Sequence, residues 1–482
     1  MNKPGCRAGR RARKKRRKKH EDEYKVTLTH EAQFVLLRRW LKQKGFSSQS
    51  LIPVSFHDTG RGLMTNQTIK AKNCVISLPE KCLLTTETVL KSYMGDYIKR
   101  WHPPVSPLLA LCCFLIAERH RGDASEWSPY INILPKTYTC PVYLSDDIID
   151  LLPRSLQKKA TEQKEQFQEL YCSSLMFFRS LQPLFTQPTE ELFTQDALRW
   201  AWCSINTRTV YMEHDQSDYL SREKDIYALA PYLDLLNHCP NVQVEAGFNK
   251  QTRCYEVKSV QGCKKFQQAL INYGPHDNNR LLLEYGFVAS GNPHSVVYVD
   301  IGTLKICLDE KDKQLTQKLL YLRDNDFLRN LTFGMDGPSW RLMTALRLLS
   351  LKPEQYSCWK SVLLGAAVSR EREEWCIHSA LKLCNNLNDD NVKALERLSQ
   401  LKQGANLPRL EQLCVVESLR QEEQRILEHT RVVLQNLWGQ NQKPHAVTAK
   451  IQTQAKSKQI LFSFVLKLLT ESPPKLQGVQ NT

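Results

Sequence analysis

The sequence has 482 residues, which is long for a single domain, so two or three domains are expected. Hydrophobic residues make up 41% of it and charged residues 24%, so most of the chain can bury a core. The formal net charge is +17, but residues 1–20 hold 11 of the lysines and arginines and no acid, which leaves +6 for the rest. The longest apolar run, LLALCCFLIA at 108–117, is too short to span a bilayer and predicts a core helix instead.

Residues 1–24 are expected to form a disordered basic tail, because this segment cannot bury apolar surface. No aromatic residue lies among its basic residues to stack on bases, so we favour a nuclear import signal, with a weak polyanion contact left open. The start of the chain lacks the apolar segment of a secretory signal. Sixteen cysteines without that signal indicate reduced thiols. We therefore expect a monomer of the nucleus and cytoplasm that does not bind membranes.

The hydrophobic pattern predicts a helix, then strands, a helical insertion, more strands and a helical end. Residues 31–45 repeat apolar positions at helical spacing, whereas 51–84 break into short apolar stretches separated by turns. Residues 105–200 return to helix, and 225–300 are rich in predicted strands, among them SVVYVDI. Long amphipathic helices, such as 340–350 and 408–439, dominate from 312 onward. Because strands about 140 residues apart must then pair, the pattern indicates an α+β fold rather than a doubly wound one.

Several common chemistries are excluded by missing motifs. The chain has no G-x-G-x-x-G after a strand, no G-x-x-x-x-G-K-[ST], no H-E-x-x-H and no G-x-S-x-G. No cysteines form a C-x-x-C pair, so a zinc site is not expected.

Four short stretches combine glycines with polar and aromatic residues: TGRGLMT at 59–65, INTRTVYM at 205–212, YLDLLNH at 232–238 and INYGPHDNNRLLLEYGF at 271–287. Each one alone is compatible with a turn, a helix end or a core aromatic residue. In this order they resemble the SET-domain protein lysine methyltransferases, and most closely the subgroup of Rubisco large-subunit methyltransferase. The resemblance covers roughly residues 45–470.

The resemblance implies a SET β-fold with a pseudoknot and a helical insertion, followed by an all-α substrate-binding domain. The expected domains are the tail at 1–24, a SET domain at 25–300 with its insertion near 100–200, and a helical domain at 301–475. The subgroup lacks the Cys-rich zinc segment of many SET proteins, and here VASGNPHSVVYVDIG follows Phe287 without a cysteine. The stretch KKFQQALINYG departs from the usual Gly-Glu turn before Tyr273, and Cys239 stands where Ser commonly follows Asn-His.

The resemblance also implies S-adenosylmethionine as the methyl donor. Glycines in TGRG would let the main chain approach this ligand, Arg208 would lie near its carboxylate, and Phe287 would pack on its adenine. The Asn-His step, at the end of an apolar strand, would hold its methionine end. The implied cofactor contacts are Thr59, Gly60, Arg61, Gly62, Arg208, Asn237, His238, Tyr273 and Phe287.

Tyr273 is the implied catalytic residue. Its hydroxyl, with the backbone carbonyls of Thr207 and Asp234, would surround the transferable methyl group, and Tyr255 and Tyr285 would line the lysine channel. The reaction would be an in-line displacement by a neutral amine, with alignment as the main contribution and no metal ion.

The predicted function is therefore a protein-lysine N-methyltransferase, and a nuclear import segment makes histones a candidate substrate. Three alternatives stay open. The acceptor could be a histidine, as in one relative of the subgroup, or the SET core could serve as a non-catalytic adaptor. The third is a nucleic-acid binder that depends on the basic tail.

Overall fold

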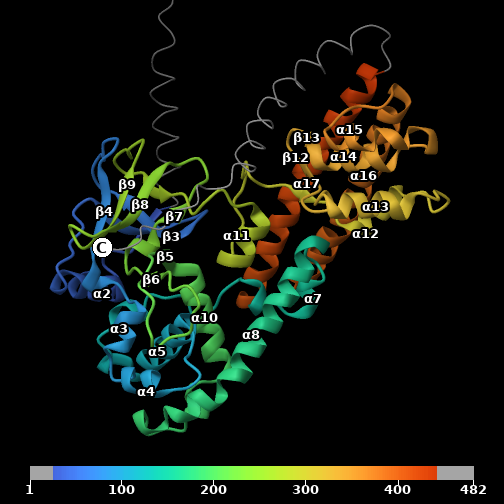
Figure 1. Cartoon of the computed structure of the whole chain (residues 1–482). Helices are drawn as coiled ribbons and strands as arrows, with labels where there is room; N and C mark the ends of the chain where they lie inside the picture. Colours follow the sequence, from blue (N-terminus) through green and yellow to red (C-terminus); the bar gives the residue numbers. More distant parts are fainter. Residues whose placement is uncertain (1–24, 442–482) are drawn as a thin grey trace, which may run out of the picture. The chain divides into compact units, whose positions relative to one another are not determined.

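The computed structural model describes residues 25–441 (Figure 1). The predicted tail at 1–24 and the end of the predicted helical domain, 442–475, lie outside the described residues. Within the described range the chain forms two compact units. Unit 1 comprises residues 25–152, 156–295 and 400–419, and unit 2 comprises residues 153–155, 296–399 and 420–441.

Unit 1 contains three small sheets whose strands come from distant parts of the sequence (Figure 1). Their strand orders are β1-β2-β3-β10-β7, β4-β9-β8 and β5-β6. The strands are β1 Lys25–Thr27, β2 Leu51–Phe56, β3 Gly60–Thr65, β4 Cys74–Pro79, β5 Thr209–Tyr211, β6 Tyr227–Leu229, β7 Asn237–His238, β8 Val244–Asn249, β9 Cys254–Ser259 and β10 Gln268–Ile271.

Strand β10 joins the early and late parts of unit 1. It pairs antiparallel with β3, where Ala269 lies opposite Leu63, and both side chains are buried. On its other edge it pairs parallel with β7, where Ile271 lies opposite His238. The TGRG stretch and the Asn-His step therefore flank one strand that leads into Tyr273. This is the pairing of distant strands that the sequence predicted.

Helix α5 (Pro107–Arg121) is the main core helix of unit 1. The Ser106 side chain accepts the Leu109 N–H, Pro107 stands in the first turn, and Gly122 with φ of 55° ends the helix. Its middle is buried on all sides, as its uninterrupted apolar run predicts. The other helices are α2 Ala32–Gln43, α3 Thr86–Leu90, α4 Gly95–Arg100, α6 Ser128–Ile131, α7 Asp146–Ile149, α8 Arg154–Ser180 (from residue 156 on), α9 Thr189–Leu192, α10 Gln195–Arg208 and α11 Asn278–Tyr285.

Unit 2 is mainly helical and has its own core, in which Phe333, Leu342, Leu346 and Leu383 are fully buried. A small sheet of order β11-β12-β13 accompanies the helices. The elements are β11 Val297–Tyr298, α12 Ile301–Leu304, α13 Leu315–Asp324, β12 Thr332–Gly334, β13 Gly337–Pro338, α14 Trp340–Leu349, α15 Trp359–Leu363 and α16 Arg370–Lys402; α17 Leu407–Asn441 contributes its part from residue 420 on.

The predicted order of elements is confirmed, and one prediction was too broad. SVVYVDI forms a strand only at Val297–Tyr298, because the Asp300 side chain accepts the Thr303 N–H and starts α12.

Candidate active site

The predicted glycine stretch is held by an amide side chain from the neighbouring motif. The Asn237 Nδ2 donates to the carbonyl oxygens of Thr59 and Arg61 at 3.4 and 3.2 Å. A Cβ at Gly62 would lie only 2.7 Å from that same Nδ2, so the main chain approaches Asn237 as closely as it does because position 62 is a glycine. A Cβ at Gly60 would meet nothing within 4 Å, so this part of the loop has open space beside it.

The Asn-His step does not end an apolar strand, as the sequence pattern had suggested. The apolar residues before it form a 3₁₀ turn, Leu233–Leu235, and the strand consists of Asn237 and His238 themselves. This turn begins after Tyr232, which has a φ of 75°, and the pairing with β10 follows the turn. The turn brings the main-chain carbonyls of residues 234–236 to the site.

Three rings gather around Tyr273. Its ring centroid lies 5.2 Å from His238, 5.1 Å from Tyr285 and 6.2 Å from Phe287. His276 extends this ring cluster, since it lies 6.2 Å from Tyr285 and its Nε2 donates to the Tyr273 carbonyl at 3.0 Å. The structure therefore brings together the predicted Tyr273, Tyr285, Phe287 and His238.

The Tyr273 hydroxyl donates to the Leu236 carbonyl at 2.7 Å. The resemblance implied the carbonyls of Thr207 and Asp234 near this hydroxyl; the Leu236 carbonyl was not predicted, because main-chain groups leave no signature in a motif. Burial raises the pKa of Tyr273 well above its ordinary value, despite the opposing effect of Arg208. Tyr273 is therefore a neutral hydrogen-bond donor.

His238 is held as a neutral ring with a defined tautomer. Its Nδ1 accepts the Tyr273 backbone N–H at 3.1 Å, so the ring proton resides on Nε2. Burial, together with His276 and His294, lowers the pKa of His238 to about 4. The Nε2 atom is buried and has no hydrogen-bond partner in the described part of the chain. It is a donor that still lacks an acceptor.

Arg208, at the end of α10, belongs to a buried charged network that the sequence revealed only in part. Its Nη1 donates to the Asp234 carbonyl at 3.3 Å and lies 3.5 Å from the Asp234 carboxylate, which is 1% exposed. The Tyr130 hydroxyl donates to the same carboxylate at 3.0 Å. Tyr130 comes from the helical insertion and was not predicted, because no motif surrounds it.

In this network the Arg208 guanidinium stays charged and keeps one hydrogen-bond donor without a partner within the described residues. Burial raises the pKa of Asp234, and both Arg208 and Tyr130 oppose that shift. Burial alone would lower the pKa of Arg208, but Asp234 raises it above its ordinary value, so the guanidinium stays charged. Its Nε is buried without a partner among residues 25–441. The network can thus accept an anionic group.

The other predicted residues, Thr207, Arg61, Thr59 and Tyr255, make no ring contact with Tyr273 and bond other parts of unit 1. Thr207 lies in the last turn of α10, where main-chain carbonyls lack a partner within the helix. Arg61 donates from Nη1 to the Ile133 carbonyl at 2.6 Å, and Thr59 bonds Gln268 through its hydroxyl. Tyr255 makes no ring contact with the cluster around Tyr273; its hydroxyl donates to the Tyr211 carbonyl at 3.2 Å, and burial raises its pKa to about 12.

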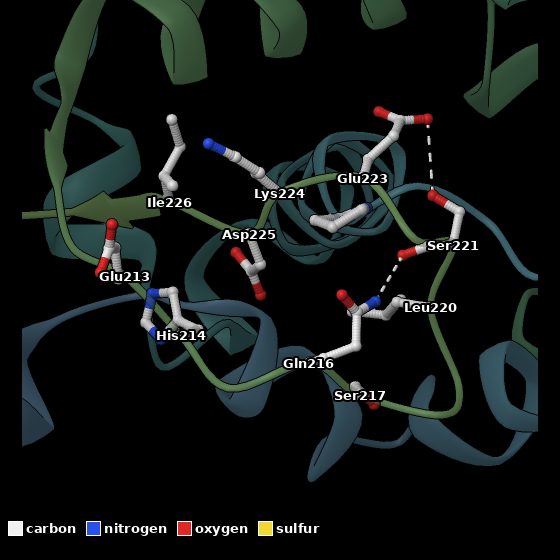
Figure 2. Close-up of a pocket in the computed structure, with 11 residues that line it drawn as sticks. Glu213, His214, Gln216, Ser217, Leu220, Ser221, Glu223, Lys224, Asp225 and Ile226 are labelled. Atoms are coloured by element: carbon white, nitrogen blue, oxygen red, sulfur yellow. Dashed lines mark hydrogen bonds between the residues drawn. The ribbon is translucent and has the colours of Figure 1, made fainter. Parts of the chain in front are cut away.

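A separate cavity of about 250 Å³ lies along the loop between β5 and β6 (Figure 2). The carboxylates of Glu213, Glu223 and Asp225 line it together with Lys224, and Pro107 at the start of α5 contributes an apolar wall. None of the predicted site residues lines this cavity, so it is distinct from the ring cluster.

The described residues show neither a membrane-spanning helix nor a cluster of metal-ligating side chains. No helix among them is long and apolar enough to cross a membrane. Residues 25–441 also contain no group of three or more His, Cys, Asp or Glu side chains that could hold a metal ion.

Comparisons with known proteins identify the family. The profile of the SET domain matches residues 60–274, and that of the Rubisco LSMT substrate-binding domain matches residues 309–427. SET domain-containing protein 4 of Mus musculus is 49% identical over 424 residues, which cover 88% of this chain and 96% of the mouse protein. The chain belongs to the SET-domain methyltransferase family.

Two further similarities of this SET-domain chain are to a curated protein and to a solved structure. Actin-histidine N-methyltransferase of Gallus gallus is 28% identical over 276 residues, which span 56% of this chain and 45% of that protein. The crystal structure of the SET domain of LSMT bound to lysine and AdoHcy aligns with a TM-score of 0.60 at 20% identity, over 86% of this chain and 93% of that one. That likeness supports the SET fold and the helical domain after it, as predicted.

Proposed function

We propose that this chain transfers a methyl group from S-adenosylmethionine to the ε-amine of a lysine in a protein substrate. The observation that carries the proposal is the setting of Tyr273. Its neutral hydroxyl is fixed on the Leu236 carbonyl within the ring cluster, one strand away from the glycine loop that Asn237 holds. A fixed phenol among aromatic faces suits the alignment of an apolar, cationic or amine group.

The residues present fit S-adenosylmethionine. Two buried donors, Arg208 Nε and His238 Nε2, lack acceptors in the described chain, and the ligand carries a carboxylate and ring nitrogens. The main chain at Gly60 and Gly62 leaves no β-carbon in the way, and Phe287 offers a ring face. When bound, S-adenosylmethionine supplies an electrophilic methyl group on a sulfonium centre. Asn237, His238, Arg208, Phe287 and the glycine loop would hold it.

The chain's own residues would then orient and activate the acceptor. Burial beside aromatic rings lowers the pKa of a lysine amine and favours its neutral, nucleophilic form. The hydroxyl of Tyr273 and the carbonyl oxygens of Thr207 and Asp234 would contact the methyl group through weak C–H···O contacts of about 0.5–1 kcal/mol each, so they orient it. Most of the rate gain would come from holding the reactants in line, which can contribute about 7–11 kcal/mol.

Lysine is proposed as the acceptor because a tyrosine-lined site suits an alkylamine. Tyr273 and Tyr285 present faces that can contact an ammonium group before it loses its proton. The similarity to an actin-histidine N-methyltransferase makes histidine the second candidate. The basic segment at 1–20 supports nuclear import and therefore nuclear substrates, with histones as the first to test.

The test is transfer of label from radioactive S-adenosylmethionine to proteins of a nuclear extract. Tyr273→Phe should abolish transfer with folding intact. Tyr232→Phe is the matched control, because the Tyr232 hydroxyl also donates to a main-chain carbonyl, that of Leu51 at 2.8 Å, but lies outside the ring cluster. Transfer that survives Tyr273→Phe would overturn the assignment of this residue.

Calorimetry separates the enzyme from a non-catalytic adaptor. Wild-type protein should bind S-adenosylhomocysteine, and Asn237→Ala should weaken that binding, because the amide that fixes the glycine loop is lost. Wild-type protein that binds neither S-adenosylhomocysteine nor S-adenosylmethionine would favour the adaptor.

A further inference from the structure

Two loops of unit 1 carry a group of lysines that the methyltransferase site does not use. Residues 66–74 and 259–267 contain Lys70, Lys72, Lys264 and Lys265, here called the lysine patch, and contain no Asp or Glu. All four side chains are exposed. None of the four makes an ion pair with any residue from 25 to 441, although nearby Lys258 pairs with Glu256 at 3.4 Å.

Backbone pairing holds the two loops side by side. Ile69 and Cys263 exchange N–H···O bonds of 2.8 and 2.9 Å, and the Lys72 N–H donates to the Ser259 carbonyl at 2.7 Å. A Cβ at Gly262 would lie 2.6 Å from the Ile69 carbonyl, so the close approach requires a glycine. The four positive charges are thus gathered on a fixed framework. Gathering like charges without counterions raises the free energy of the folded state, so an anionic partner is the natural counterpart.

An exposed aromatic ring lies within the lysine patch. Phe266 is 51% exposed and has a φ of 66°, a backbone conformation that non-glycine residues rarely adopt. The Lys265 ammonium lies 4.7 Å from the centroid of this ring. A phenylalanine ring beside lysines can stack on a base while the lysines contact phosphates, and a single-stranded nucleic acid presents a base and a phosphate at every nucleotide.

Lys25 adds a further cation beside the lysine patch. Residues 1–24 contain 11 lysines and arginines and lead directly into Lys25, whose Nζ donates to the Phe266 carbonyl at 3.5 Å. Lys25 is thus hydrogen-bonded to the loop that carries Lys264 and Lys265.

We propose that the lysine patch and Phe266 form a binding surface for nucleic acid, with phosphates on the lysines and an unpaired base on the ring. This surface is independent of methyl transfer. It differs from binding by the terminal segment alone, because folded side chains contribute phosphate contacts of their own.

The test measures binding of a fluorescent, mixed-sequence single-stranded DNA oligonucleotide to the full-length chain over a range of salt concentrations. The patch variant carries Lys70→Gln, Lys72→Gln, Lys264→Gln and Lys265→Gln. The control variant carries Lys42→Gln, Lys136→Gln, Lys158→Gln and Lys224→Gln, four other exposed lysines of unit 1, so the two variants have equal net charge. Both keep the terminal segment, whose contribution therefore cancels.

Four lost phosphate contacts should reduce the slope of log K against log salt by about 3 in the patch variant. The control variant should keep the wild-type slope. Phe266→Ala should weaken binding but leave the slope of log K against log salt unchanged. Equal slopes for the patch and control variants would overturn the proposal and assign binding to the terminal segment. Unlabelled DNA and polyglutamate are then compared as competitors at equal charge. If polyglutamate displaces the oligonucleotide as efficiently as DNA does, the choice of nucleic acid is overturned.

Discussion

Tyr130→Phe tests whether the charged network around Arg208 receives the carboxylate of the methyl donor. The substitution removes one oxygen atom and keeps the ring that fills the core. The Tyr130 hydroxyl is the closest donor to the buried Asp234 carboxylate, at 3.0 Å against 3.5 Å for Arg208, and the other carboxylate oxygen has no partner within residues 25–441. Without the phenol, Asp234 is free to turn toward Arg208 and to compete with the ligand for it.

The expected magnitude follows from the kind of bond that is lost. A hydrogen bond to a charged group contributes about 1.5–3 kcal/mol. If about 1.4 kcal/mol of this is lost from ligand binding, the Kd for S-adenosylhomocysteine rises about tenfold. The kcat should change little, because Tyr130 does not contact the ring cluster around Tyr273.

Calorimetry with two ligands isolates the effect. The tenfold loss should appear with S-adenosylhomocysteine and should vanish with its decarboxylated analogue, since only the former has a carboxylate for Arg208. Tyr232→Phe is the matched control, because the Tyr232 hydroxyl is buried in the same unit but donates to the main-chain carbonyl of Leu51 at 2.8 Å. An equal loss with both ligands, or an equal loss in both variants, would refute the reasoning and indicate a general packing defect.

Three other predictions concern stability. Gly62→Ala places a Cβ 2.7 Å from the Asn237 Nδ2, which should cost about 1–3 kcal/mol in urea unfolding and also weaken S-adenosylhomocysteine binding; unchanged binding would count against the glycine loop. The pKa of His238 falls from 6.5 to about 4 on folding, so the unfolded chain binds the extra proton between these values. The unfolding free energy should therefore drop as pH falls through this window, and less so in His238→Gln; parallel profiles would contradict this. Lys318→Met removes a buried ammonium that donates to the half-buried Asp312 carboxylate and to the main-chain carbonyls of Leu349 and Leu351. The loss of this donor should cost about 1–3 kcal/mol in thermal unfolding, whereas an unchanged unfolding free energy would contradict this role.

The parts of the site that sequence could predict are those whose chemistry depends on side-chain identity at a fixed spacing. A Cβ at position 62 would lie 2.7 Å from the Asn237 Nδ2, so glycine is favoured there, and both residues stand in short motifs of the sequence. Tyr273, Tyr285 and Phe287 lie within fifteen residues of one another, and one strand end and one helix bring them together. The order of strands and helices followed from hydrophobic periodicity.

The parts that could not be predicted depend on tertiary contacts. Tyr130 lies on a helix of the insertion, and no motif near it in the sequence indicates its hydrogen bond to Asp234. The Leu236 carbonyl is a main-chain group, so residue type carries no information about it. The apolar run at 232–236 resembled a strand because a short apolar run is compatible with a strand or with a 3₁₀ turn, and only the pairing of Asn237 and His238 with β10 decides between them.

The most direct test of the central claim is a comparison of methylated peptides by tandem mass spectrometry. Nuclear extract is incubated with S-adenosylmethionine and either the wild-type chain, Tyr273→Phe or the Tyr232→Phe control. We predict methyl groups on lysine side chains that appear with the wild-type chain and with Tyr232→Phe and are absent with Tyr273→Phe. Methyl groups confined to histidine would contradict the lysine assignment, and identical peptides from the wild-type chain and Tyr273→Phe would contradict the site itself.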